Sequence, residues 1–264
     1  MIEGREVPVQ DIVNSVFGLA GHHALVTGGS SGLGFDIARC FLAAGARVTI
    51  TGTDRAKLDS AVTELGENAA GFVCDVTQLD AADDFAGRVA SERGAVSILV
   101  NNAGRTVKNP LDAMTAEEFQ AVLNIHVSGA FACSRAFVKQ IEASGNGSIL
   151  FTASMSSFLG IPNVIGYSAA KAAHVGMVRA LATELAPRGV RVNGVAPGWI
   201  DTPLFRKATA SDPARRAKID GRIPMGRLGQ GADIGWAMTY LASPAANYVT
   251  GHILVVDGGA LHGF

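Results

Sequence analysis

The chain has 264 residues, of which 48% are apolar and 17% charged, enough apolar material for the core of one α/β domain. Lys plus Arg total 22 and Asp plus Glu total 23, so a net charge of -1 offers no basic surface to nucleic acid or to an anionic membrane. Cys40, Cys74 and Cys133 lie too far apart for a disulfide framework or a zinc site. We therefore expect a soluble cytoplasmic protein with reduced thiols and no bound metal.

Short β-branched runs alternate along the chain with longer amphipathic segments, for example the helical patterns over 34–44 and 167–186. This alternation predicts right-handed crossovers and a single-domain, doubly wound parallel sheet (Rossmann-like) with helices on both faces. Residues 1–16 are expected to form an N-terminal extension and residues 17–264 the dinucleotide-binding catalytic domain. The expected strands are 24–27, 47–51, 71–74, 97–100, 148–152, 191–195 and 253–256.

A glycine-rich segment, TGGSSGLG at 27–34, lies where the first expected strand turns into the first helix. Glycines there let the backbone approach a pyrophosphate, which the N-terminus of the helix then stabilises. The spacing is G-x-x-x-G-x-G and differs from the G-x-G-x-x-G fingerprint of many dinucleotide-binding proteins. Taken alone, the segment also fits a tight turn without a ligand. The candidate cofactor-binding residues in it are Gly28, Ser30, Ser31, Gly32, Leu33 and Gly34.

Tyr167 and Lys171 lie four residues apart at the start of an expected helix, so their side chains share one helix face. A free tyrosine has a pKa near 10, too high for an efficient base at neutral pH. An ammonium group about 4 Å away would lower that pKa by roughly three units at most. We therefore expect Lys171 to lower the pKa of Tyr167, although the pair alone would equally fit a surface contact.

Further motifs follow the expected strands at the edge where open α/β sheets bind ligands. The segment NNAG (101–104) follows the fourth strand, Ser154 the fifth, and Pro197 with Gly198 the sixth. With these motifs in this order, the chain resembles the short-chain dehydrogenase/reductase family over about residues 19–259. The matching segments are TGGSSGLG, NNAG, a serine thirteen residues before YSAAK, VNGVAPGWIDTP and GHILVVDGG.

The resemblance implies roles for individual residues. Ser154 would hydrogen-bond the substrate oxygen, Tyr167 would transfer the proton, and Lys171 would contact both the phenol and the nicotinamide ribose. Asp75 and Thr202 would contact the cofactor, although Asp75 alternatively fits a helix-capping acid and Thr202 a turn hydroxyl. Assembly as a homotetramer through the helices around 119–141 and 167–185 is a further implication. The remaining cofactor contacts would be Asp75, Val76, Asn102, Ala103, Gly104, Pro197, Gly198, Ile200 and Thr202.

His126 departs from the family pattern, because an asparagine generally occupies its position as the fourth catalytic residue. The family role runs largely through that residue's backbone carbonyl and a water leading to the lysine, and a histidine can supply the same carbonyl. Alternatively, an imidazole near Lys171 that titrates close to neutrality would add a pH dependence. We interpret the other five histidines as structural or surface residues.

The chemistry implied is hydride transfer between a nicotinamide cofactor and a secondary alcohol or ketone, including a polyol or sugar derivative. A reductase of carrier-bound 3-ketoacyl groups is the alternative reaction, and a non-catalytic dinucleotide-binding scaffold is the alternative of another class. The choice between NAD and NADP usually depends on an acid or an arginine after the second strand. Gly52 occupies the usual position of the acid and Thr53 that of the arginine, so Asp54 and Arg55 are the nearest candidates for the two roles. We favour NAD over NADP for two reasons. A carboxylate lies nearby without a well-placed cation, and Ser31 stands where many NADP users carry a basic residue.

The segment 199–228 contains Pro203, Pro213 and Pro224 and follows the sixth strand at the ligand edge. We expect it to form a mobile helical flap over the substrate. Its positive charges fit a solvated helix face or, alternatively, recognition of an acidic substrate. These charges are Arg206, Lys207, Arg215, Arg216, Lys218 and Arg222.

Overall fold

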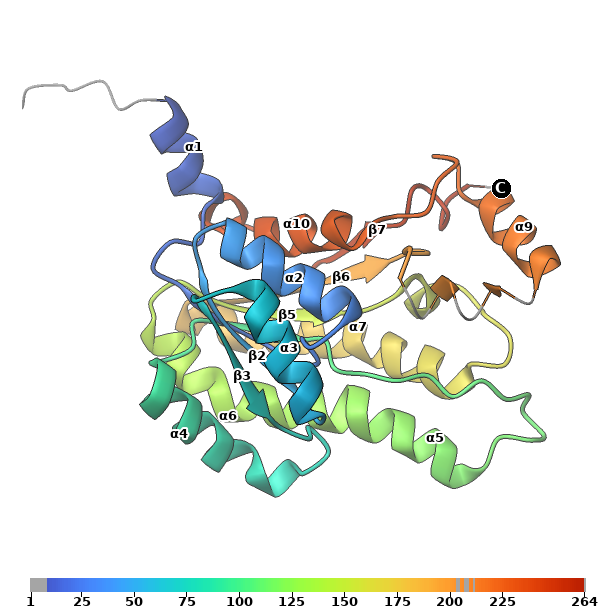
Figure 1. Cartoon of the computed structure of the whole chain (residues 1–264), viewed down its shortest axis with the longest axis horizontal. Helices are drawn as coiled ribbons and strands as arrows, with labels where there is room; N and C mark the ends of the chain where they lie inside the picture. The colour runs from blue at the N-terminus through green and yellow to red at the C-terminus, as the bar shows by residue number, and fades with distance from the viewer. Residues whose placement is uncertain (1–8, 203–204, 207–208, 211, 264) are drawn as a thin grey trace, which may run out of the picture.

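Seven parallel strands form one sheet in the order β3-β2-β1-β4-β5-β6-β7, with helices on both of its faces (Figure 1). The computed structural model describes residues 9–202, 205–206, 209–210 and 212–263. The architecture confirms the expected doubly wound, Rossmann-like sheet. The strands are β1 (His23–Val26), β2 (Arg47–Gly52), β3 (Ala69–Val73), β4 (Ile98–Asn101), β5 (Gly147–Thr152), β6 (Val190–Pro197) and β7 (Ile253–Val256).

The two helices whose ranges were expected, 34–44 and 167–186, begin and end within about two residues of those positions. Helix α7 begins at Ile165, two residues before Tyr167, so the tyrosine lies in the first turn rather than at its first position. Such differences arise because backbone hydrogen bonds, rather than side-chain periodicity, decide where an element ends. The helices are α1 (Val9–Phe17), α2 (Gly32–Ala43), α3 (Arg55–Leu65), α4 (Ala82–Arg93), α5 (Ala116–Leu123), α6 (Ala130–Ala143), α7 (Ile165–Leu185), α9 (Pro213–Arg222) and α10 (Gly231–Ala242).

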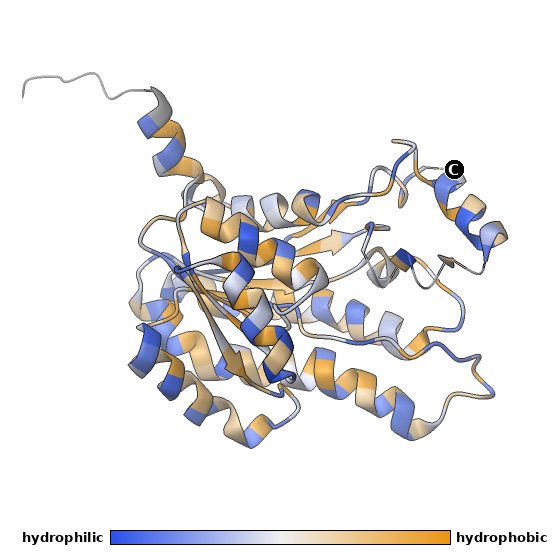
Figure 2. Ribbon diagram, viewed as in Figure 1, coloured by the Kyte–Doolittle hydropathy of each residue, from blue (hydrophilic) through white to orange (hydrophobic). Residues whose placement is uncertain are grey.

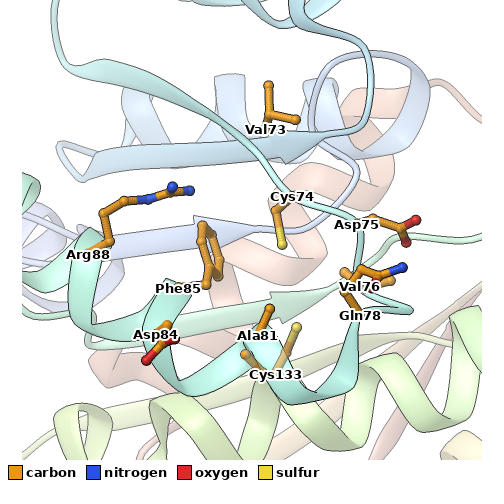
Figure 3. A pocket seen from close by; sticks show the side chains of 11 residues that line it. Val73, Cys74, Asp75, Val76, Gln78, Ala81, Asp84, Phe85, Arg88 and Cys133 are labelled. Atoms are coloured by element: carbon orange, nitrogen blue, oxygen red, sulfur yellow. The ribbon is translucent and has the colours of Figure 1, made fainter.

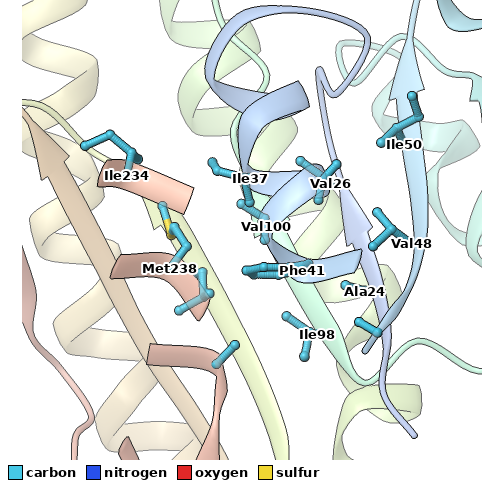
Figure 4. Close-up of a cluster of buried hydrophobic side chains, with 14 of the residues drawn as sticks. Ala24, Val26, Ile37, Phe41, Val48, Ile50, Ile98, Val100, Ile234 and Met238 are labelled. Atoms are coloured by element: carbon cyan, nitrogen blue, oxygen red, sulfur yellow. The ribbon is translucent and has the colours of Figure 1, made fainter. Parts of the chain in front are cut away.

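Two hydrophobic cores lie on opposite faces of the sheet. On one face, α2 packs on α10, and Phe41, Met238 and Val26 of β1 belong to one buried cluster (Figure 4). On the other face, Phe85 of α4 and Phe137 of α6 pack edge to face at 5.9 Å. The helices turn their apolar sides toward the sheet and their hydrophilic sides outward (Figure 2). Because both faces are covered, the central strands are almost continuously apolar, as is typical of parallel sheets.

The order of the strands fixes where a ligand can bind. From β1 the chain moves outward through β2 and β3, and then returns to add β4 on the other side of β1. The connections after β1 and β4 therefore diverge, which leaves a crevice at the carboxyl ends of these two strands. The glycine-rich segment follows β1 and the NNAG segment follows β4, so both lie at this crevice.

In the described part of the chain, one helical run, Ala116–Ala143, is long and apolar enough to cross a membrane by length and composition alone. The sequence had not led us to expect such a run. It comprises α5, α6 and a π-helical segment between them, η2 (Asn124–Gly129). Cys133, Phe137 and Ile141 of this run belong to the core beneath the sheet. The run is thus a packed core helix in this fold.

Two segments lie outside the sheet. Helix α1 precedes β1 within the expected extension, whose residues 1–8 lie outside the described residues, as do Pro203 and Lys207 of the expected flap. Helix α9 of the flap lies beyond the carboxyl end of β6 (Figure 1). Its Ile219, together with Ile223, joins Met155 and Leu159 in a small separate cluster. The flap segment therefore packs on the loop that follows β5.

Candidate active site

The glycine-rich segment needs glycines for conformational and steric reasons. Gly28 and Gly32 have φ angles of 65° and 57°, in the left-handed region that other residues rarely adopt. A Cβ on Gly28 would lie 2.9 Å from the Cα of Ala103, and one on Gly34 would overlap the carbonyl of Gly28. The side chain of Ser31, the residue before α2, accepts no hydrogen bond from that helix. The N–H groups of the first turn are thus left for an anion, and the segment fits a pyrophosphate.

Asn102 joins the ends of three strands. Its side-chain amide donates to the carbonyls of Thr27 and Gly28, at 3.0 and 3.2 Å, and its amide oxygen accepts from the Thr152 hydroxyl at 3.1 Å. The Thr27 hydroxyl oxygen accepts from the N–H groups of Asn102 and Ala103, at 2.9 and 3.0 Å. Thr27 and Thr152 are not among the expected site residues, since only their positions at strand ends indicated the contact.

Ser154 lies two residues after β5 and is 8% exposed. Its hydroxyl oxygen accepts from the N–H of Ser156 at 3.1 Å, in a short 3-10 turn. The Ser157 hydroxyl donates to the carbonyl of Lys171 at 2.7 Å and so fastens this turn to α7. Ser156 and Ser157 thus belong to the turn after β5, and Ser157 aligns this turn with the tyrosine helix.

Tyr167 and Lys171 share one face of α7, with the Lys171 Nζ 5.5 Å from the centroid of the tyrosine ring. Lys171 is only 3% exposed and donates from Nζ to the carbonyl of Thr152. Burial lowers the pKa of Lys171 to about 7, because the charged form loses its hydration. Burial therefore disfavours the ammonium form of Lys171 in the chain by itself.

The expected lowering of the Tyr167 pKa is wrong for this structure. Burial raises the pKa of Tyr167, and a hydrogen bond with the Ser154 hydroxyl opposes that rise without cancelling it. The physical reason is that both partners are desolvated together: the phenolate loses hydration, and the buried Lys171 loses part of its charge. The chain by itself thus keeps the phenol neutral.

His126 lies in the π-helical segment and is 2% exposed. Its Nε2 donates to the carbonyl of Arg105 at 2.9 Å, and its ring lies 5.5 Å from the Tyr167 ring at 80°. A Cβ at Gly104 would overlap the imidazole, so the histidine is itself a reason for that glycine. Burial, and then the charge of Lys171, lower the pKa of His126 to about 3. The imidazole is therefore neutral, and the titration near neutrality considered above does not arise here.

The carbonyl of His126 accepts a hydrogen bond from Nε2 of His174 at 2.8 Å. We expected His174 to be a structural or surface residue; it is 2% exposed, and its ring lies 6.1 Å from that of His126. A signal was available: His174 lies seven residues after Tyr167 and three after Lys171, on the same helix face. His174 and His126, which departs from the family pattern, thus meet at one place in the fold.

Two other predicted cofactor residues follow β3. The Asp75 carboxylate accepts from the N–H and the hydroxyl of Thr77, at 2.9 and 2.7 Å, which is a local turn interaction. Val76 lies against Gly129 of the π-helical segment, where a Cβ would come within 2.9 Å of it. Both residues lie at the carboxyl end of β3, at the same edge of the sheet as the glycine-rich segment.

The predicted residues after β6 lead into the flap. Pro197 ends β6, and the N–H of Gly198 donates to the carbonyl of Val256 at 3.0 Å. Ile200 is buried in the core, and the Thr202 hydroxyl oxygen accepts from the N–H of Phe205 at 3.2 Å. Thr202 therefore acts as a turn hydroxyl here, the alternative considered for it.

The chain is similar throughout its fold to known proteins. A family model described as enoyl-(acyl carrier protein) reductase matches residues 28–261. The galactitol 2-dehydrogenase (L-tagatose-forming) of Cereibacter sphaeroides is 42% identical over 93% of this chain and 97% of its own length. The 2-dehydro-3-deoxy-D-gluconate 5-dehydrogenase of Pseudoalteromonas atlantica is 39% identical over 92% and 97%.

This chain belongs to the short-chain dehydrogenase/reductase family. A crystal structure of the gluconate 5-dehydrogenase of Burkholderia cenocepacia, in complex with NADP and tartrate, is 31% identical, with a TM-score of 0.91, and the match covers 96% of this chain and 100% of that one. The chain is accordingly a nicotinamide-dependent oxidoreductase that interconverts an alcohol and a ketone. The expected family, fold and class of enzyme are confirmed.

The side chains after β2 that bear on the choice of nicotinamide cofactor are already engaged. Asp54 caps α3 by accepting from the N–H of Lys57 at 3.1 Å, and Nζ of Lys57 lies 3.5 Å from its other oxygen. Arg55 pairs with Asp59, one turn along α3, at 3.1 Å. Ser30 lies close to Gly52, where a Cβ would come within 3.0 Å of its hydroxyl. The geometry supports binding of a nicotinamide dinucleotide in general.

A cavity of about 260 Å³ lies between β3 and the helices α4 and α6 (Figure 3). Asp75 and Val76 line it, together with Cys74, Phe85 and Cys133. Burial raises the pKa of Cys74 to about 11 and that of Cys133 to about 12, so both remain thiols. The lining contains none of the candidate catalytic residues and two of the candidate cofactor-binding residues, Asp75 and Val76. Among the described residues, no three His, Cys, Asp or Glu side chains gather to hold a metal ion.

Proposed function

We propose that the chain interconverts a secondary alcohol and a ketone in a small polyol or sugar derivative, with Tyr167 as its acid and base. One observation carries the proposal. Tyr167 and Lys171 face the Ser154 turn from α7, at the same edge of the sheet as the glycine-rich segment. The names of the polyol and sugar-acid dehydrogenases among its relatives support this class of substrate.

Each site residue has its own role in the proposed reaction. In oxidation, deprotonated Tyr167 accepts the proton of the substrate hydroxyl, and in reduction the neutral phenol donates it. The Ser154 hydroxyl holds the substrate oxygen, where negative charge develops. Lys171 stabilises the phenolate whenever its amine is protonated. A nicotinamide dinucleotide, held by the glycine-rich segment and by Asn102, supplies the hydride donor or acceptor.

The test of this function is turnover with a panel of substrates. Reduced nicotinamide fluorescence would be followed with galactitol and related polyols, with sugar acids, with simple secondary alcohols and with a 3-ketoacyl thioester. We expect the polyols or sugar acids to give the highest kcat/KM. The highest kcat/KM with the thioester would favour the carrier-bound alternative, which the description of the family model also suggests. Cofactor binding without turnover on any substrate would favour the scaffold alternative.

NAD is the cofactor that we propose. A carboxylate, Asp54, stands just after β2, while the nearby Arg55 guanidinium is already paired with Asp59 and is not directed at a 2′-phosphate. The related Burkholderia cenocepacia structure contains NADP, so the measurement must compare both cofactors. A kcat/KM more than tenfold higher with NADP than with NAD would reverse this proposal.

We also propose a homotetramer in the cytoplasm, assembled through the long helices α5, α6 and α7. Phe131 of α6 and Ile165 of α7 are large apolar residues that are about half exposed in the single chain, as expected of an interface. Light scattering on the purified protein should give four times the chain mass of 27.2 kDa. Reduced thiols fit the cytoplasm, and cell fractionation would test the location.

A further inference from the structure

His174 links the reactive face of α7 to the π-helical segment that carries His126. Helices α5 and α7 run side by side, and α7 also contacts η2 (Figure 1). Tyr167, Lys171 and His174 follow the spacing i, i+4, i+7 and therefore occupy one face of α7. From that face, Nε2 of His174 reaches the carbonyl of His126 at 2.8 Å. A single side chain thus connects the helix of the tyrosine to the turn opposite it.

The partners of the two imidazoles determine their tautomers. A carbonyl oxygen can only accept a hydrogen bond, so Nε2 of His174 must carry a proton to bond the His126 carbonyl. By the same argument, Nε2 of His126 is protonated to bond the Arg105 carbonyl. The Nδ1 atoms of both rings are buried without a hydrogen-bond partner among the described residues. Burial and the charge of Lys171 also lower both pKa values to about 3, so both rings are neutral.

The hydrogen bonds run in series from α7 to the loop after β4. His174 donates to the His126 backbone, and the His126 side chain donates to the Arg105 backbone. The His126 ring lies edge to face with the Tyr167 ring at 5.5 Å and with the His174 ring at 6.1 Å. Fixing the His126 carbonyl therefore fixes the π-helical turn that packs beside the tyrosine.

We propose that His174 is a positioning residue of the reaction, whose Nε2–H holds the His126 carbonyl and thereby fixes the π-helical turn that packs beside Tyr167. The inference rests on the proposed function, because it concerns the same tyrosine. A π-helical turn breaks the regular helical ladder and is common at functional sites, so its backbone groups need partners from outside the helix. His174 supplies such a partner across 48 residues of sequence.

The chain offers a matched control for a histidine that is merely buried. His23 is also 2% exposed, and its ring bonds the Gly94 carbonyl and the Thr49 hydroxyl, each at 2.9 Å. It lies at the amino end of β1, the end of the strand opposite the candidate site. Loss of either histidine should lower the melting temperature, because each leaves buried partners unsatisfied. Only loss of His174 should change the catalytic step.

Four proteins test the proposal: wild type, His174→Leu, His174→Gln and His23→Leu. Leucine removes the N–H, whereas the glutamine amide can donate from a similar distance. We expect kcat of His174→Leu to fall by about tenfold or more, because small displacements of reacting groups are costly. KM and the cofactor Kd should change less than twofold, and His174→Gln should recover kcat to within about threefold of wild type. Wild-type kcat in folded His174→Leu, or no recovery in folded His174→Gln, would overturn the proposal.

The hydrogen bond can also be read in the wild-type protein without any substrate, should the His174 variants fail to fold. In 15N-histidine NMR spectra, with His126→Asn used to assign one ring, both His126 and His174 should show the Nε2–H tautomer and keep it between pH 5 and 9. Titration of the His174 ring between pH 5 and 9, or an Nδ1–H tautomer of that ring, would overturn the proposal. Failure of the proposed function is distinguishable, since it would appear as no turnover in wild type while these spectra stayed as expected.

Discussion

The glycine-rich segment after β1 and the reactive face of α7 lie at the same sheet edge but depend on different properties of the chain. The segment depends on conformation: Gly28 has a φ of 65°, and a Cβ there would press on Ala103. The α7 face depends on burial, which lowers the pKa of Lys171 to about 7 and raises that of Tyr167. Steric demands are visible as glycines in a sequence. Electrostatic demands depend on distant residues and appear only in the fold.

Removing the tyrosine hydroxyl should have the largest effect on kcat and should leave the glycine-rich segment intact. We expect Tyr167→Phe to lower kcat by about 10²- to 10⁴-fold, because proton transfer to or from the substrate oxygen loses its group. The cofactor Kd should stay within about twofold, since the glycine-rich segment is untouched. Stopped-flow turnover and cofactor fluorescence titration measure the two quantities. Substantial kcat in the folded variant would refute the assignment of Tyr167.

The opposite result is expected when the glycine-rich segment is altered. Gly28→Ala should weaken cofactor binding by about tenfold or more, since the left-handed conformation costs about 1 kcal/mol or more and the new Cβ meets the Ala103 backbone. At saturating cofactor, kcat should remain near wild type. Gly66→Ala is the control: it has a φ of 91° with no neighbour within 4 Å and lies at the end of α3. It should lower stability without changing the cofactor Kd, and equal cofactor Kd values for the two variants would contradict the steric argument.

The sequence predicted more of the first region than of the second. The alternation of strands and helices, and the motifs at the strand ends, predicted the sheet and the positions of Ser154, Tyr167 and Lys171 within it. The direction of the Tyr167 pKa shift was not predictable, because it depends on burial by residues from several elements. The partner of the His126 carbonyl was also missed: spacing places His174 on the same helix face as Lys171, but the π-helical turn that presents the carbonyl leaves no mark in the side-chain pattern.

A smaller effect is expected from His126→Asn. Asparagine keeps the backbone carbonyl that His174 bonds, so kcat should stay within about tenfold of wild type. Because the pKa of His126 is lowered to about 3, the kcat profiles of the two proteins should superimpose between pH 6 and 7.5. If the kcat profile of wild type has a step between pH 6 and 7.5 that the variant lacks, the His126 ring titrates during catalysis. A fall of more than a hundredfold in kcat would show that the side chain itself is essential.

The free energies of unfolding of wild type and His126→Asn should differ at lower pH. The folded state binds fewer protons than the unfolded state, whose histidine has a pKa near 6.5, so wild type should lose stability as the pH falls below that value. His126→Asn removes this contribution, which is worth about 1.4 kcal/mol per pH unit at most. Urea unfolding at pH 7 and pH 5 would measure it. An equal loss of stability in both proteins would mean that the imidazole is accessible to protons in the fold.

The smallest effect is expected from the charges of the flap segment. Arg206 is tied to Asp201 by two hydrogen bonds of 2.7 and 2.9 Å, and Arg216 to Asp220, as on a solvated surface. Exposed pairs of this kind contribute about 1 kcal/mol or less. Replacing Arg206 and Arg222 by glutamine should therefore change kcat/KM by less than about twofold, equally for neutral polyols and sugar acids. A selective loss of tenfold or more with the sugar acids would instead show that the flap recognises a carboxylate, and the electrostatic argument made for α7 would then extend to the flap.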